Sequence, residues 1–99
     1  MAFRVELTAR AHWDLAAIYE YIHADSSAHA YRWFNGLEDA ILSLEKHPKR
    51  RTVAREPRLR QLLYGSKPNV YRIIYSIRLR SRLALVLHIR HGARPDFRE

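Results

Sequence analysis

The spacing of apolar residues along this 99-residue chain changes at Pro48. Before Pro48 they recur every three or four positions, which predicts helices over residues 9–24 and 28–46. After Pro48 they alternate with polar residues, which is typical of strands. A short alternating stretch also opens the chain, so the expected strands cover residues 3–7, 59–64, 70–78 and 83–91. The pattern predicts an α+β fold of order β-α-α-β-β-β, in which an N-terminal helical hairpin packs on a small, mostly antiparallel sheet.

Length and composition indicate a single domain over residues 1–99. A chain of this size buries enough apolar surface to fold without disulfides, and the sequence has no cysteine. No stretch approaches the roughly 18 apolar residues of a membrane span. We therefore expect a soluble protein of the cytoplasm with no membrane partner. Residues 48–58 contain two prolines and little apolar content, so we expect a basic loop there.

The net charge of +8 is distributed unevenly along the chain. Residues 1–45 carry a net charge of −4, residues 46–72 carry +8, and residues 73–99 carry +4. Such asymmetry indicates a polyanionic partner for the C-terminal half, either nucleic acid or an acidic protein segment. The simpler alternative is a solvated basic surface, which is how we interpret Arg78 and Lys49 individually.

Strand alternation places several polar side chains on one face of the hairpin predicted near the C-terminus. Arg72 lies on the less apolar face of its strand, and His88 and Arg90 lie on the less apolar face of the next. Pairing of the two strands predicts that these three residues share one surface, which suits a phosphate or a carboxylate. The expected core consists of Leu15, Ile18, Ile22, Leu37, Ile41, Leu44, Ile73, Tyr75, Leu85 and Leu87.

No metal or cofactor is expected. His88 and His91 are three positions apart, so on a strand they point to opposite faces and make poor joint ligands. The other histidines scatter over the helical half, where we interpret them as surface or cap residues. Trp13, Trp33 and Phe34 belong to the acidic half, and we interpret them as core or docking residues rather than stacking platforms for bases.

Motifs spread over nearly the full chain resemble those of the RelE/ParE toxin superfamily. They are Ala11-x-x-Asp14-Leu15-x-x-Ile18-x-x-Tyr21-Ile22, Arg60-Gln61-Leu62, Tyr71-Arg72-Ile73-Ile74-Tyr75 and His91-Gly92-Ala93-Arg94. The resemblance implies a RelE/ParE-like fold and a growth-inhibiting toxin of a type II toxin–antitoxin system of the plasmid-stabilisation type. It also implies a cognate acidic antitoxin that neutralises the toxin and forms a hetero-oligomer with it.

The superfamily has two known activities, and the resemblance leaves both open. RelE-like members cleave mRNA on the ribosome with arginines that match Arg72 and Arg94, whereas ParE-like members poison DNA gyrase and lack most of that set. The lysines of RelE are absent from residues 58–64 of this chain, and so is its late tyrosine. A related nuclease pattern uses a glutamate as general base and a histidine as general acid, which here correspond to Glu56 and His91.

We therefore predict a ParE-like inhibitor of DNA gyrase, with a RelE-like ribosome-dependent mRNA endoribonuclease as the alternative. Whether the chain is an enzyme stays open. If it is a nuclease, the predicted catalytic residues are Arg72, Arg94, His91 and Glu56. The predicted antitoxin- or target-binding residues are Arg60, Arg72, His88, Arg90 and Arg94.

Overall fold

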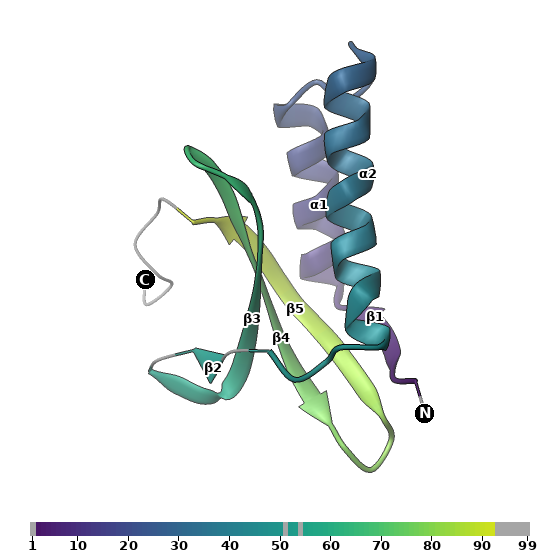
Figure 1. The fold of residues 1–99 in the computed structure, drawn as a ribbon, viewed down its shortest axis with the longest axis vertical. Helices are drawn as coiled ribbons and strands as arrows, with labels where there is room; N and C mark the ends of the chain where they lie inside the picture. The colour runs from purple at the N-terminus through teal and green to yellow at the C-terminus, as the bar shows by residue number, and fades with distance from the viewer. Residues whose placement is uncertain (1, 51, 54, 93–99) are drawn as a thin grey trace.

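The fold has two layers, a helical hairpin and a five-stranded sheet whose one face the helices cover (Figure 1). The computed structural model describes residues 2–50, 52–53 and 55–92. Its elements are β1 (Arg4–Leu7), α1 (Ala9–Tyr21), α2 (Ala28–Leu42), the 3-10 turn η1 (Ser43–Glu45), β2 (Thr52–Val53), β3 (Glu56–Ser66), β4 (Asn69–Arg78) and β5 (Leu83–His91). The sheet order is β1-β5-β4-β3-β2, with β1 parallel to β5 and the other pairs antiparallel. The predicted α+β class is confirmed.

Hydroxyl side chains start both helices. Thr8 Oγ1 accepts a hydrogen bond from the N–H of Ala11 (3.1 Å), and Ser27 Oγ accepts one from the N–H three residues on. α1 ends at Tyr21, earlier than predicted, because His23 adopts a left-handed backbone conformation with φ of 53°. Within the described residues, neither helix has the length and apolar character needed to cross a membrane.

The segment predicted to be a basic loop contains strand structure. β2 and the first residues of β3 lie within residues 48–58, so β3 begins at Glu56 instead of residue 59. This end of β3 pairs only with β2 and is exposed. Its sequence, which includes Pro57 and Arg58, therefore lacks the apolar alternation of a half-buried strand, and the prediction of a loop was wrong for that reason.

An additional residue in β5 changes the faces predicted for its first half. Ile74 pairs with His88, but the next residue, Tyr75, pairs with Val86. Leu87 is therefore the extra residue of a β-bulge. Strict alternation holds on each side of the bulge, but not across it.

The core lies between the helical hairpin and the sheet. Six predicted core residues are buried there, namely Ile18, Leu37, Ile41, Leu44, Ile73 and Tyr75. Leu15 and Ile22 are half-buried against the same core. The prediction was wrong for Leu85 and Leu87, which are half-buried outside this cluster because the bulge turns Val86 toward the helices instead.

Candidate functional site

β4 and β5 bring together three of the predicted binding residues. Arg72 pairs directly with Arg90, and His88 pairs with Ile74 two positions along. All three side chains belong to the sheet face opposite to Ile73, which packs in the core, and all three residues are half-buried. We call Arg72, His88 and Arg90 the outer-face cluster. Two guanidinium groups beside an imidazole suit an anionic ligand such as a phosphate or a carboxylate.

Arg60 and His91 occupy the opposite face of the sheet from the outer-face cluster. Arg60 pairs with Tyr75 and His91 pairs with Tyr71, so both belong to the helix-facing side. Arg60 donates from Nη1 to the backbone carbonyl of Arg50 (2.7 Å). The ring of His91 lies edge-on to the ring of Tyr71, with 5.0 Å between the ring centroids. Arg60 therefore cannot act on a ligand held by the outer-face cluster without a change of structure, whereas His91 and Arg90 line one open cavity beside α1.

Glu56 lies far from Arg72. It is exposed at the first position of β3, whereas Arg72 pairs with Leu63, seven residues further along that strand. Arg60, where the pairing with β4 ends, lies about 10 Å along β3 from Leu63, and Glu56 lies further on, in the part of β3 that pairs only with β2. The structure thus does not bring Glu56, Arg72 and His91 into one constellation, and the fourth predicted catalytic residue, Arg94, lies outside the described residues.

A buried tyrosine attaches the basic loop after η1 to the sheet. The Tyr75 hydroxyl donates to the carbonyl oxygen of Pro48 and accepts from the N–H of Arg50 (3.2 Å). Burial raises the pKa of the Tyr75 phenol, against the lowering effects of the Arg50 N–H and the charges of Arg60 and Arg50. Arg50 also donates from Nε to the His47 carbonyl (3.0 Å). These hydrogen bonds hold the start of the basic loop, at Pro48 and Arg50, against Tyr75 of β4.

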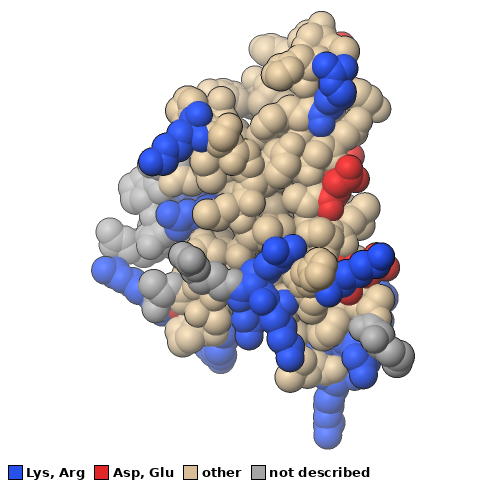
Figure 2. Space-filling model, in the orientation of Figure 1, with Lys and Arg blue, Asp and Glu red and all other residues tan. Residues whose placement is uncertain are grey.

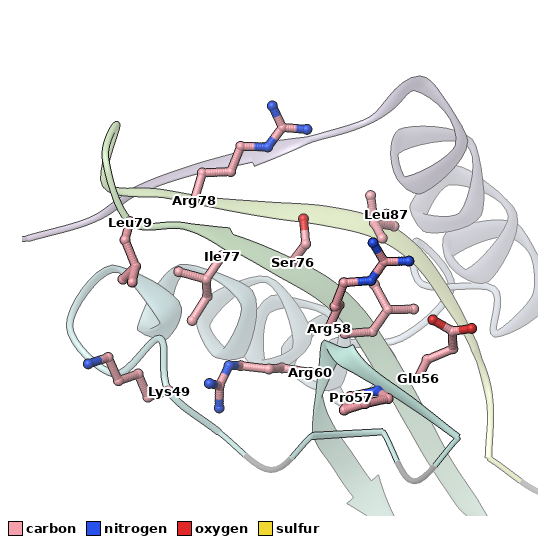
Figure 3. A pocket seen from close by; sticks show the side chains of 11 residues that line it. Lys49, Glu56, Pro57, Arg58, Arg60, Ser76, Ile77, Arg78, Leu79 and Leu87 are labelled. Atoms are coloured by element: carbon pink, nitrogen blue, oxygen red, sulfur yellow. The ribbon is translucent and has the colours of Figure 1, made fainter.

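β3 and β4 diverge beyond the pairing of Arg60 with Tyr75. From there β3 turns toward β2, while β4 continues beside β5 (Figure 1). An open cavity of about 790 Å³ lies between the diverging strands (Figure 3). Its charged lining consists of Lys49, Glu56, Arg58, Arg60 and Arg78. We call this cavity the basic groove. Figure 2 shows that Lys and Arg side chains gather over this lower part of the molecule.

Sequence reasoning missed the basic groove, because Arg78 and Lys49 were interpreted as separate solvated residues. They come from the end of β4 and from the loop before β2, and only the tertiary fold places them beside Arg58 and Arg60. The available signal was the block of nine basic residues against one acid in residues 46–72, which predicted an anionic partner without locating it.

A helical hairpin on one face of a five-stranded sheet, with a strongly basic C-terminal half, defines this chain as a small α+β protein of the RelE/ParE architecture. The chain belongs to the family of ParE toxins of the type II toxin–antitoxin system parDE, whose family model matches residues 5–95. The predicted superfamily is therefore confirmed. No curated protein matches the chain by sequence.

Solved structures of toxin–antitoxin systems share the fold. The chromosomal ParDE system of P. aeruginosa matches with a TM-score of 0.70 and 17% identity over 90% of this chain and 95% of that chain. The intact E. coli RelBE toxin–antitoxin complex matches with a TM-score of 0.67 and 12% identity over 94% of this chain and 100% of that chain. An E. coli RelE mutant in the free state matches with a TM-score of 0.66 and 12% identity, covering 94% of this chain and 86% of that chain. At these identities the likeness is one of fold.

Proposed function

We propose that this toxin acts in the cytoplasm as a ParE-like inhibitor of DNA gyrase and is neutralised by a cognate acidic antitoxin. The observation that carries the proposal is the separation of Glu56, Arg72 and His91 on the sheet. Membership in the ParE family and the absence of lysine from residues 58–64 support the same activity. Inhibition through protein contacts requires a complementary surface and no acid–base constellation.

Cleavage of RNA by attack of a 2′-hydroxyl makes a stricter demand on geometry. It needs a general base, a general acid and a cation within hydrogen-bond reach of one phosphate. Glu56 lies beyond the end of the β3–β4 pairing, more than about 10 Å along β3 from the position that pairs with Arg72, so this structure does not hold both side chains at one phosphate. The nuclease hypothesis would therefore require other residues as acid and base.

A supercoiling assay with purified gyrase tests the proposal. We expect the toxin to inhibit supercoiling of relaxed plasmid, and the antitoxin to relieve the inhibition. Induction in cells should start the SOS response and filamentation before translation stops. Normal supercoiling in the presence of folded, antitoxin-binding toxin would overturn the proposal.

Ribosome-dependent mRNA cleavage is the second candidate function, and the outer-face cluster is the observation that favours it. Arg72 and Arg90 pair across β4 and β5, so two arginines lie side by side on one face of the sheet, and guanidinium groups suit a phosphate. If this activity exists, Arg72→Ala should lower cleavage about 100-fold or more while ribosome binding persists, because the lost charge acts mainly in the transition state. Arg32→Ala, on the exposed face of α2, is the matched control.

A further inference from the structure

An open cavity of about 630 Å³ lies between α1 and the end of β5, and we call it the α1–β5 cavity. Pairing of β5 with β1 stops at Val86, and no described strand pairs with residues 89–91 on that side. The cavity therefore opens at the edge of the sheet. This position explains why Arg90 and His91 both line it, although adjacent residues of a strand point to opposite faces.

The described lining of the cavity carries more cations than carboxylates. Arg10, Arg90 and the imidazole of His91 lie around it, together with the single carboxylate of Asp14. Both oxygens of Asp14 are engaged, since one accepts from the N–H of Ile89 and the other from Nε of Arg10. The side chain of Arg10 is 62% exposed, and Nε is one of five N–H donors of a guanidinium, so donors remain for a ligand. This part of the lining suits an anion with several acceptor oxygens, such as a phosphate.

The part of the lining that α1 contributes is aromatic. Trp13, Ala17 and Tyr21 are spaced by four positions, so they share one face of the helix. Trp13 and Tyr21 are 71% and 76% exposed, and their Cα atoms are about 12 Å apart along the helix axis. The small side chain of Ala17 lies between them and leaves room for a planar ring. Exposed aromatic side chains beside cations are the combination that holds a nucleobase next to its phosphate.

The charge distribution along the sequence argues against contact between Trp13 and a nucleobase, because Trp13 belongs to the acidic half. The fold removes that argument, since Arg90 and His91 of the basic half line the same cavity. An aliphatic acid would satisfy the cations and leave the aromatic faces unused. An uncharged aromatic ligand would leave the cations unused. A phosphorylated nucleoside engages both kinds of lining.

We propose that the α1–β5 cavity binds a phosphorylated nucleoside. Its base lies over Ala17 and stacks on Trp13 and Tyr21, and its phosphate accepts hydrogen bonds from Arg10 and Arg90. A free mononucleotide and the terminal nucleotide of a single strand both present this chemistry. The α1–β5 cavity and the basic groove share no described lining residue, and the site does not depend on the assignment of gyrase as target.

Isothermal titration calorimetry with AMP tests the proposal. We expect saturable binding that weakens about tenfold or more in Trp13→Ala, which removes a stacking partner, and in Arg10→Gln, which removes a phosphate-binding charge. The matched controls Tyr31→Ala and Arg32→Gln change exposed residues of α2 outside the cavity. Each control should alter binding by about twofold or less. Thermal melts establish that the variants are folded.

Ribose 5-phosphate and adenosine each carry one part of the ligand and should bind about tenfold or more weakly than AMP. Equal binding of either would show that the phosphate or the base contributes nothing, and would overturn the proposal. Equal losses in the controls, or no saturable binding of AMP, would overturn it as well. AMP should also quench the tryptophan emission, and quenching that persists in Trp13→Ala would place the base elsewhere.

A 5′-phosphorylated pentaadenosine distinguishes the two sources of the ligand. Weaker binding than that of AMP assigns the cavity to a free nucleotide. Tighter binding, with the same loss in Trp13→Ala, assigns it to the end of a strand. Tighter binding without that loss would place the strand outside the cavity and count against the site. No readout involves gyrase, so failure to inhibit gyrase would overturn the proposed target and leave this site standing.

Discussion

The carboxylate of Asp14 on α1 accepts a hydrogen bond of 2.9 Å from the backbone N–H of Ile89 on β5. Asp14 is buried, and its other oxygen accepts from Nε of Arg10 (3.0 Å). Ile89 lies beyond Val86, where the pairing of β5 with β1 ends. A helix side chain thus satisfies a backbone donor that a neighbouring strand would otherwise satisfy, and α1 covers this part of the sheet edge.

Replacement of Asp14 by alanine should lower the free energy of unfolding by about 1–3 kcal/mol, because it leaves the N–H of Ile89 buried without its acceptor. Asp14→Asn retains a side-chain oxygen and should have a smaller effect. Arg10→Ala removes only the exposed partner and should change stability by about 1 kcal/mol or less. Urea unfolding of the three variants measures the difference, and equal losses for Asp14→Ala and Arg10→Ala would contradict this role.

Gly36 allows α2 to approach β3 at Tyr64. A Cβ atom added at Gly36 would lie 2.2 Å from the hydroxyl oxygen of Tyr64, which donates to the backbone carbonyl of Trp33 (2.7 Å). Gly36→Ala should therefore destabilise the protein by about 1 kcal/mol, although alanine is otherwise favoured in a helix interior. In a Tyr64→Phe background the oxygen is absent, so the penalty should shrink. A double-mutant cycle of thermal or urea unfolding measures this coupling, and additivity would contradict the contact.

Ile73 and Leu87 should differ in their response to truncation. Ile73 is fully buried in the core, so Ile73→Ala should lower the free energy of unfolding by about 2–5 kcal/mol. Leu87 is the half-buried bulge residue, so Leu87→Ala removes less buried area and should cost roughly 1–2 kcal/mol. Equal losses measured by urea unfolding would indicate that Leu87 packs in the core after all.

The contrast between Ile73 and Leu87 shows how far the sequence predicts this molecule. Helical and alternating periodicities predicted the fold class, both helices and the buried face of β4, because burial directly selects apolar residues there. Nothing in the local composition around Leu87 marks an additional residue, since both faces of β5 are apolar in this stretch. The bulge follows from pairing with β4, which is a tertiary property.

The two candidate sites also differ in how far the sequence predicts them. Alternation within two adjacent strands was enough to predict that Arg72 and Arg90 share a face, and their pairing across β4 and β5 agrees. The basic groove depends on the divergence of β3 from β4, and that divergence brings Arg58 near Arg78 from positions 20 residues apart in sequence. Local periodicity carries no information about such a contact.

Tyr75 should make stability depend on pH in the alkaline range. Burial raises the pKa of its phenol above the ordinary value of 10.0, so the folded state favours the neutral form. The corresponding stability is complete below pH 10.0 and is lost as the pH rises through the folded-state pKa. Tyr75→Phe should lower the free energy of unfolding by about 1–3 kcal/mol at neutral pH, because Pro48 and Arg50 lose a hydrogen-bond partner. The same variant should also show a smaller loss of stability above pH 10.0, because the phenol is absent.

Urea unfolding from about pH 8 to pH 11 tests this, with Tyr64→Phe as the comparison. Burial also raises the pKa of Tyr64, and the charge of Asp39 adds to that effect. Each variant should therefore reduce the loss of unfolding free energy at alkaline pH, in proportion to the pKa shift of the tyrosine that it removes. If Tyr75→Phe loses as much stability at alkaline pH as the unmodified protein does, the loss comes from other titrating groups.

Association with an acidic antitoxin should slow as salt rises, because residues 46–99 carry a net charge of +12. The Debye length falls from about 10 Å at 0.1 M salt to about 3 Å at 1 M, which removes long-range attraction but leaves direct contacts. Stopped-flow mixing across this range should show a falling association rate and a smaller change in dissociation. An association rate indifferent to salt would exclude charge steering. Apolar docking on α1, where Trp13 and Tyr21 are 71% and 76% exposed, would then be the main driving force.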